Sequence, residues 1–440
     1  MEGDGGPAGC LEQTPKLQEV AVPSISTSVK LLAGLASGAV LLVACGPADE
    51  IAEGDDAPEA QDDAAVADDE APVSGSVERD EGPGEREGFF WEMSEEPSST
   101  IDISEIISGG PPPDGIPPIE DPVYESFDDA AEWLSDDSPV MVVRGETETK
   151  VYPLAILTWH EIVNDAIDGE PAVITYCPLC NSGLAFEAEI DGAVLDFGTS
   201  GRLWRSNLVM YDRQYGNLWT QFTGEAIVGE RFVGQTLERI PTTLQGFAEV
   251  RSTDPDALVL SRDTGFNRTY GQNPYTGYDA EDSEPFLFRG EADGRFAPMT
   301  RVVGFPDGDG TAVLLDHLEE ERVVEFDDEN HPVTLWWAPG QASALDTASI
   351  DAGRDVGQTA AFVAELDGER LSFEPVDGAG GGDDAVRFRD TQTGSGWNLA
   401  GRAVEGELEG AELQAVSIDD TFWFVWAVFK PDTEVIGGAG

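Results

Sequence analysis

A predicted strand that runs directly into two cysteines organises the sequence, and it reads Ala172-Val173-Ile174-Thr175-Tyr176-Cys177-Pro178-Leu179-Cys180. Its β-branched and aromatic residues favour an extended chain. After Asn181-Ser182-Gly183 an alternating segment begins, and it turns at Asp191-Gly192 into another short apolar run. Such a pattern is typical of a β-hairpin. We therefore expect the cysteines in a knuckle between strands, and not at the start of a helix as in thioredoxin-like folds.

The pair Cys177 and Cys180 is open to three kinds of chemistry. A C-x-x-C motif forms half of a metal site, a redox dithiol or a small structural disulfide. Outside the cytoplasm two thiols are oxidised by default unless a metal holds them. A knuckle can direct two sulfurs and several backbone N–H groups at one cation, which favours a metal over thioredoxin-type chemistry.

A metal site needs more ligands than this pair supplies. No second C-x-x-C exists, which excludes a zinc ribbon within one chain. His160 lies on a helix predicted over residues 154–167, directly before the cysteine strand, and we predict it as the third ligand. Glu161 and Asp165 are predicted as a further ligand or as outer carboxylates. The alternative is that His160 is a hydrogen-bonded core histidine.

The remaining pattern predicts an α+β, β-rich domain over residues 115–437, with mostly antiparallel short strands and a few helices near its start. A capping box at Ser126 predicts one short helix, and residues 154–167 predict another. The bulky run from Thr421 to Phe429 is expected to form a central strand that is covered on both faces. No clean internal repeat is visible in the pattern.

The N-terminal region resembles a bacterial lipoprotein signal. Lys30 precedes an apolar stretch from Leu31 to Val43, which is too short to span a bilayer. It ends at Ala44-Cys45, and the Cys45 thiol is the expected lipid acceptor. Residues 1–45 are therefore predicted to be a signal region. Because residues 1–28 are acidic, we expect the true start to lie downstream, near residue 29.

Residues 46–114 form a predicted acidic tether. They are rich in Asp, Glu, Ala, Gly and Pro and offer few side chains for a core. Such a segment is expected to be disordered and extended by self-repulsion. It would hold the folded domain away from the outer side of the cell membrane, to which the lipid on Cys45 would attach it.

The formal net charge of -63 limits the partners of the protein. Nucleic acids need a basic patch, and no basic stripe exists in the sequence, so nucleic-acid binding is excluded. The acidic residues are spread along the chain and form no D-x-D-x-D-G calcium loop. We therefore favour a halophilic adaptation, in which salt screens the repulsion, over a calcium-binding surface.

Several motifs in order resemble the family called domain of unknown function 3179, over roughly residues 115–437. The resemblance implies a prokaryotic and often exported protein, and it implies no established activity. The motifs are Trp159-His160-Glu161-Ile162-Val163-Asn164-Asp165, Ile174-Thr175-Tyr176-Cys177-Pro178-Leu179-Cys180-Asn181-Ser182-Gly183, Leu208-Val209-Met210-Tyr211-Asp212-Arg213, Tyr270-Gly271-Gln272-Asn273-Pro274-Tyr275 and Phe422-Trp423-Phe424-Val425-Trp426.

We therefore predict a lipid-anchored extracytoplasmic protein that binds copper or zinc through Cys177, Cys180 and His160, since thiolate and imidazole suit these metals. Two alternatives stay open. One is a thiol–disulfide oxidoreductase that uses the same cysteines without a metal. The other is a scaffold or binding protein in which they form a structural disulfide.

The lipid anchor is tested by Cys45→Ser. The variant lacks the thiol that accepts the lipid, so it should lose membrane retention and be found soluble or unprocessed after cell fractionation. Metabolic labelling with a radioactive fatty acid provides the measurement. Continued labelling of the Cys45→Ser protein would show that Cys45 is not the lipid acceptor.

Overall fold

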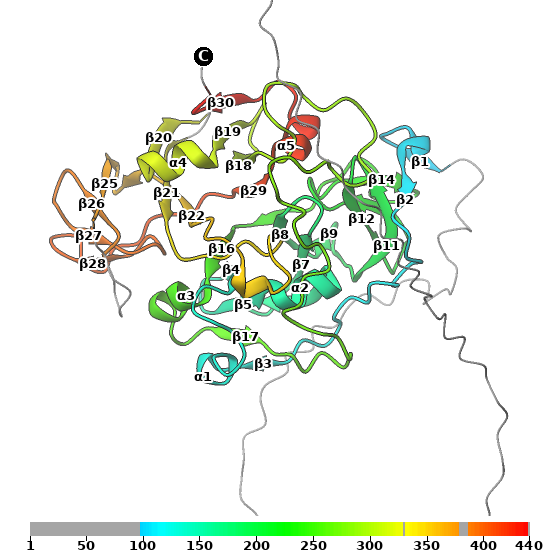
Figure 1. The fold of residues 1–440 in the computed structure, drawn as a ribbon, viewed down its shortest axis with the longest axis horizontal. Helices are drawn as coiled ribbons and strands as arrows, with labels where there is room; N and C mark the ends of the chain where they lie inside the picture. The colour runs from blue at the N-terminus through cyan, green and yellow to red at the C-terminus, as the bar shows by residue number, and fades with distance from the viewer. Residues whose placement is uncertain (1–96, 329–330, 378–385, 439–440) are drawn as a thin grey trace, which may run out of the picture. The chain divides into compact units, whose positions relative to one another are not determined.

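The computed structural model describes residues 97–438, apart from 329–330 and 378–385 (Figure 1). Cys45, the predicted signal region and residues 46–96 of the predicted tether lie outside the described residues. Within the described part, no helix combines the length and the apolar character that a membrane crossing needs.

The predicted helix over residues 154–167 is two elements. Helix α2 (Leu154–His160) ends at Glu161, whose φ of 60° is left-handed, and strand β6 (Ile162–Ile167) follows at once. β6 pairs antiparallel with β7 (Glu170–Cys177). The apolar spacing suits a helix, but the β-branched Ile162 and Val163 find partners in a sheet, and that pairing decides the conformation.

The predicted central strand at 421–429 is also two elements. Strand β29 (Asp419–Phe422) leads into helix α5 (Trp423–Phe429). Five of the seven α5 residues are buried, so this helix is apolar on nearly all sides. A short apolar run of this kind reads as a buried strand or a buried helix, and its periodicity cannot separate the two.

The predicted fold class, α+β with helices near the start of the domain, is wrong in where it places the helices. The described chain is β-rich and mostly antiparallel, with five short α-helices spread along it. Besides α2 and α5 they are α1 (Phe127–Ala130), α3 (Phe247–Thr253) and α4 (Leu315–Glu321). The helices are spread along the chain because one set of elements occurs twice, with α2 and α3 in the first set and α4 and α5 in the second.

Two segments of the chain have their strands and helices in the same order. We call residues 139–260 repeat 1 and residues 301–436 repeat 2; Figure 1 colours them cyan to green and yellow to red. Repeat 1 has a sheet with the order β16-β4-β5-β17, and repeat 2 has one with the order β29-β18-β19-β30. In each sheet the first two pairings are antiparallel and the last is parallel. The strands are β4 (Pro139–Arg144), β5 (Thr149–Pro153), β16 (Thr242–Gly246), β17 (Leu258–Leu260), β18 (Arg301–Phe305), β19 (Thr311–Leu314) and β30 (Glu434–Ile436), and β3 (Tyr124–Glu125) extends the first sheet.

The second sheet of each repeat follows a helix that ends in the same way. α2 ends at left-handed Glu161, and α4 ends at left-handed Arg322 with a φ of 63°. The sheet orders are β15-β8-β7-β6 in repeat 1 and β22-β21-β20 in repeat 2. In repeat 2 the isolated bridge Phe362↔Ala415 takes the place that the pairing of β15 with β8 has in repeat 1. The further strands are β8 (Ser182–Glu187), β15 (Arg239–Ile240), β20 (Val323–Asp327), β21 (Pro332–Ala338) and β22 (Gln358–Val363).

The third sheet also occurs twice, with the orders β14-β13-β12-β11 and β28-β27-β26-β25. Short hairpins, β9–β10 and β23–β24, precede these strands in their repeats. β1 (Ser98–Ser99) and β2 (Ile107–Ser108) extend the repeat 1 sheet, although they lie in the range assigned to the tether. The strands are β9 (Glu189–Ile190), β10 (Ala193–Val194), β11 (Phe197–Trp204), β12 (Asn207–Asp212), β13 (Leu218–Thr220), β14 (Ala226–Gly229), β23 (Glu365–Leu366), β24 (Glu369–Arg370), β25 (Phe373–Pro375), β26 (Phe388–Asp390), β27 (Gly396–Trp397) and β28 (Ala403–Glu405).

Side chains confirm that the repeats correspond. Each repeat carries the pattern D-x-Q-x-G-x-x-W, beginning at Asp212 and at Asp390. The Asp212 carboxylate accepts hydrogen bonds from three backbone N–H groups of the following turn, from Asn217 Nδ2 and from Trp219 Nε1. Asp390 likewise accepts from its turn and from Trp397 Nε1, at 3.0 Å. In each repeat a buried carboxylate therefore organises the equivalent turn.

The two repeats contact each other in two equivalent places. Strand β16 of repeat 1 packs against β22 of repeat 2, and β29 of repeat 2 packs against β8 of repeat 1. β16 corresponds to β29, and β8 corresponds to β22, so the contacts follow an approximate twofold relation. The largest apolar cluster includes side chains of both repeats, among them Phe186 of β8 and Trp426 of α5. The two repeats therefore share a core.

Asp212→Ala should lower the free energy of unfolding by roughly 2–4 kcal/mol, because it leaves several buried N–H donors without an acceptor. Asp390→Ala should have a similar effect in repeat 2. The exposed Asp256→Ala is the control, with an expected change within about 0.5 kcal/mol. Denaturant unfolding measures all three. Equal stability of the Asp212→Ala and Asp256→Ala proteins would contradict the role given to the carboxylate.

Candidate functional site

The cysteines lie in the tight turn that joins β7 to β8 in repeat 1. Cys177 ends β7 and pairs with Ser182, the first residue of β8. Both cysteines are free thiols, and their sulfurs share a hydrogen bond at 3.4 Å. Cys177 is 2% exposed and Cys180 is fully buried. The turn therefore presents two neighbouring thiols inside the core.

Asn181 closes this turn. Its φ of 53° is left-handed, a conformation that asparagine tolerates better than most residues. Its side chain is buried and accepts a hydrogen bond from Tyr176 Oη at 3.2 Å. Its amide nitrogen donates to the backbone carbonyl and to the carboxylate of Asp420, at 3.3 and 3.1 Å. A residue of repeat 2 thus holds the last residue of the turn.

The Cys177 thiol is the more acidic of the two. Burial alone would raise its pKa, but hydrogen bonds from the Cys180 thiol and from the backbone N–H groups of Leu208, Cys180 and Leu179 outweigh burial and lower that pKa. Oriented N–H donors favour a thiolate over a thiol. Negative charge in the pair is therefore most stable on Cys177.

The Cys180 thiol keeps its proton more strongly. Burial raises its pKa well above the usual value, and the hydrogen bond to Cys177 and the charge on Cys177 raise it further. Asn207 Nδ2 donates to Cys180 Sγ at 3.5 Å, and Cys180 Sγ lies 3.7 Å from the Ser206 carbonyl oxygen. Loss of the proton from Cys177 therefore makes loss of the proton from Cys180 harder.

Repeat 2 also holds the backbone of the turn. The Cys180 carbonyl oxygen accepts hydrogen bonds from Thr421 Oγ1 at 2.8 Å and from the Phe422 N–H at 3.3 Å. The neighbouring Asp420 forms a buried ion pair with Arg301, at 2.7 Å. The turn therefore sits at the contact between β8 and β29.

A long loop covers the site. Residues 261–300 connect β17 to β18 without a helix or a named strand. Tyr278 Oη donates to the carbonyl of Leu179, within the cysteine turn, at 3.0 Å, and it accepts from the Phe286 N–H at 3.1 Å. Ser206 Oγ donates to the Phe286 carbonyl at 2.5 Å. Loops of this length in a compact domain usually serve a function, such as covering a site.

The structure places His160 beside this loop and engages both of its ring nitrogens. Nδ1 lies 2.7 Å from the Pro117 carbonyl oxygen, and Nε2 lies 2.7 Å from Tyr270 Oη. Burial lowers the pKa of His160, which favours the neutral ring. These contacts match the alternative of a hydrogen-bonded core histidine, and a metal would have to displace one of the partners.

Glu161 and Asp165 have different surroundings. Glu161 is 7% exposed, and burial followed by the charge of Cys177 raises its pKa well above the usual value, so it lies within electrostatic reach of the dithiol. Asp165 instead accepts hydrogen bonds from Tyr152 at 2.6 Å and from Lys150 at 3.0 Å. The structure thus brings Glu161, but not Asp165, into the electrostatic surroundings of the cysteines.

The donor set for a metal is small. Within the described residues, no group of three or more His, Cys, Asp or Glu side chains is arranged to hold an ion. Zinc usually takes four ligands, and the cysteine turn offers two thiols. The residues present therefore do not build a four-coordinate zinc site, and copper or zinc binding stays a prediction.

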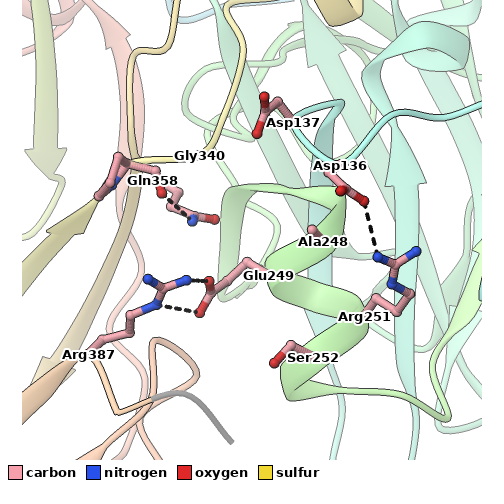
Figure 2. A pocket seen from close by; sticks show the side chains of 10 residues that line it. Asp136, Asp137, Ala248, Glu249, Arg251, Ser252, Gly340, Gln358 and Arg387 are labelled. Carbon is pink, nitrogen blue, oxygen red and sulfur yellow. Dashed lines mark hydrogen bonds and ion pairs between the residues drawn. The ribbon is translucent and has the colours of Figure 1, made fainter. Parts of the chain in front are cut away.

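A separate cavity of about 350 Å³ lies near the contact between β16 and β22, between α3 of repeat 1 and residues Gly340 and Gln358 of repeat 2 (Figure 2). Both arginines that line it form ion pairs with carboxylates of the lining. Arg251 pairs with Asp136 at 3.1 Å, and Arg387 pairs with Glu249. The cysteines do not line this cavity.

Several residues of the site were not predicted from the sequence. Asn207, Tyr278 and Asp420 contact the cysteine turn from positions 27 to 239 residues further along the chain. No local motif marks them. Tyr270 is the exception, because it belongs to the motif Tyr270–Tyr275 and contacts His160.

Comparison with known proteins agrees with this arrangement of motifs. Comparisons with curated proteins and with solved structures found no match. A family model described as "Protein of unknown function (DUF3179)" matches residues 113–433, which is well over half of the 440 residues and includes the cysteine turn, all of repeat 1 and repeat 2 up to its last strand, β30. The chain therefore belongs to the DUF3179 family.

Proposed function

We propose that Cys177 and Cys180 form a redox dithiol that undergoes thiol–disulfide exchange. The observation that carries the proposal is the buried pair of free thiols, 3.4 Å apart, in which backbone N–H groups stabilise negative charge on one sulfur. A thiolate is the nucleophile in such exchange, and a second thiol close by completes it.

The two sulfurs have different roles in the reaction. The Cys177 thiolate attacks one sulfur of a substrate disulfide, whose S–S bond breaks, and the departing thiolate takes up a proton. Cys180 then loses its proton and attacks the Cys177 sulfur, which releases the second substrate thiol. The protein dithiol is oxidised by two electrons while the substrate disulfide is reduced to two thiols. A dithiol reductant then reduces the Cys177–Cys180 disulfide, becomes a disulfide itself, and regenerates the protein dithiol.

The cover over the turn limits the substrate. Because Cys177 and Cys180 are 2% and 0% exposed, a disulfide can reach the sulfurs only after residues 261–300 have moved, and a small disulfide needs the smaller movement. The hydrogen bonds of Tyr278 to Leu179 and Phe286 are the contacts that such a movement would break. We therefore favour a low-molecular-weight disulfide as the substrate class.

Metal binding is the second candidate. The N–H groups that point at Cys177 would also stabilise a metal-bound thiolate. Two thiolates suit a soft ion such as copper(I) better than zinc, which needs further ligands. In this case Cys177 and Cys180 would hold the ion, and His160 would join them only by giving up one of its hydrogen bonds.

The place of action is part of the proposal. A lipid on Cys45 would hold the protein at the outer side of the cell membrane, and the acidic residues 46–96 would give it reach. The support is the sequence pattern alone. An oxidising compartment suits a dithiol that reacts with disulfides.

The reduced full-length protein should reduce a low-molecular-weight aromatic disulfide and release two thiols for each dithiol oxidised, as followed by absorbance. Cys180→Ser should stop at a mixed disulfide on Cys177, which mass spectrometry detects. Cys177→Ser should fall to the rate of the double variant Cys177→Ser/Cys180→Ser, which retains Cys10 and Cys45 and is the control. A wild-type rate equal to that of the double variant, with one metal ion bound per chain, would favour the second candidate.

A further inference from the structure

The duplication supplies an internal comparison for the cysteine turn. β7 pairs with β8 so that Cys177 faces Ser182, and β21 pairs with β22 so that Ala338 faces Gln358. Ala338 therefore corresponds to Cys177, and the turn that follows Ala338 in repeat 2 contains no cysteine. The molecule thus carries one turn with the dithiol and one without it.

The strand pair β18–β29 of repeat 2 and the equivalent pair β4–β16 of repeat 1 differ in charge. In repeat 2 the register pairs Arg301 with Phe422 and Val303 with Asp420. In repeat 1 it pairs Pro139 with Gly246 and Met141 with Leu244. Arg301 and Asp420 therefore stand where repeat 1 has Pro139 and Leu244.

This ion pair is costly where it lies. The side chains of Arg301 and Asp420 are 8% and 5% exposed, and charges so deeply buried lose most of their hydration. The equivalent positions in repeat 1 hold apolar residues, so a strand pair of this kind forms without the two charges. The charged face contacts the cysteine turn, through the Asn181 side chain and the Cys180 carbonyl.

The contacts show what the pair does there. One Asp420 oxygen accepts from Arg301 at 2.7 Å and from Asn181 Nδ2 at 3.1 Å. The next residue, Thr421, donates to the Cys180 carbonyl. Repeat 2 therefore holds the backbone carbonyl of Cys180 and the side chain of Asn181 from one strand.

We propose that Asp420, held in place by Arg301, is a positioning residue that keeps the cysteine turn in its dithiol arrangement. The inference rests on the proposed function. A disulfide needs the sulfurs about 2.05 Å apart, so closing the bond requires the two cysteines to approach each other from a sulfur separation of 3.4 Å. A strand that fixes Asn181 and Cys180 opposes this movement and stabilises the reduced form, which makes the disulfide more oxidising.

The test replaces the pair by apolar side chains, in Arg301→Met/Asp420→Leu. Leucine is the residue at the equivalent position 244. The full-length protein is equilibrated with glutathione buffers, alkylated and analysed by mass spectrometry. The dithiol–disulfide equilibrium should shift toward the disulfide at least about tenfold, which is about 30 mV. No shift relative to wild type would overturn the inference.

The matched control is Glu249→Leu/Arg387→Met, which removes a buried ion pair that joins repeat 1 to repeat 2, at the contact that lacks cysteines. Its equilibrium should stay within about twofold of wild type. An equal shift in both double variants would mean that loosening the repeats in general is responsible, and would overturn the role of Asp420. Asp420→Asn retains an acceptor for Asn181 and should shift the equilibrium less than the double variant.

Two further measurements test the inference if the double variant does not fold or if the cysteines form no disulfide. If Arg301→Met/Asp420→Leu does not fold, Thr421→Val removes the hydrogen bond to the Cys180 carbonyl and should shift the equilibrium in the same direction; no shift counts against the inference. If the wild-type cysteines never form a disulfide, the proposed function fails, and hydrogen exchange of residues 177–183 decides the inference. Faster exchange in the Asp420 variants than in the control supports it, and equal exchange overturns it.

Discussion

The hydrogen bonds between the cysteine turn and strand β29 are the contacts on which the site depends. A buried carbonyl such as that of Cys180 needs a donor, and one left without a partner costs about 1–3 kcal/mol. Thr421 and Phe422 provide the donors, and Asp420 accepts from Asn181. These residues belong to repeat 2, whereas the cysteines belong to repeat 1. The dithiol therefore needs both repeats folded together.

The duplicated architecture explains both the symmetry of the scaffold and the asymmetry of the site. Each repeat builds the same three sheets and the same Asp–Trp turn, but only repeat 1 has cysteines after its central strand. In repeat 2 the connection from Ala338 to Gln358 is much longer, and it pairs with the loop that covers the dithiol, as the bridge Gln272↔Ser349 shows. Repeat 2 thus lacks the thiols, but it supplies hydrogen-bond partners for Cys180 and Asn181 and a contact with the covering loop.

Part of this arrangement could be predicted from the sequence. Alternating short strands indicated a β-rich, mostly antiparallel domain, and the residues around Cys177 indicated the family. The break at Glu161 was missed because apolar spacing over 154–167 suits a helix as well as a helix followed by a strand. The repeat was missed because its clearest trace, the pattern at Asp212 and Asp390, is two short matches far apart in the chain. The partners of His160 and Asn181 are tertiary contacts that no local pattern encodes.

The central claim is that Cys177 and Cys180 work as a redox pair and not as metal ligands. Protein purified without chelator or reductant, with Cys10 and Cys45 replaced by serine, tests it most directly when intact mass and metal content are measured across a series of glutathione buffers. We expect no bound metal and a reversible loss of two hydrogens from the Cys177–Cys180 pair. A stoichiometric metal ion that protects both thiols from oxidation, or thiols that stay reduced in the most oxidising buffer, would contradict it.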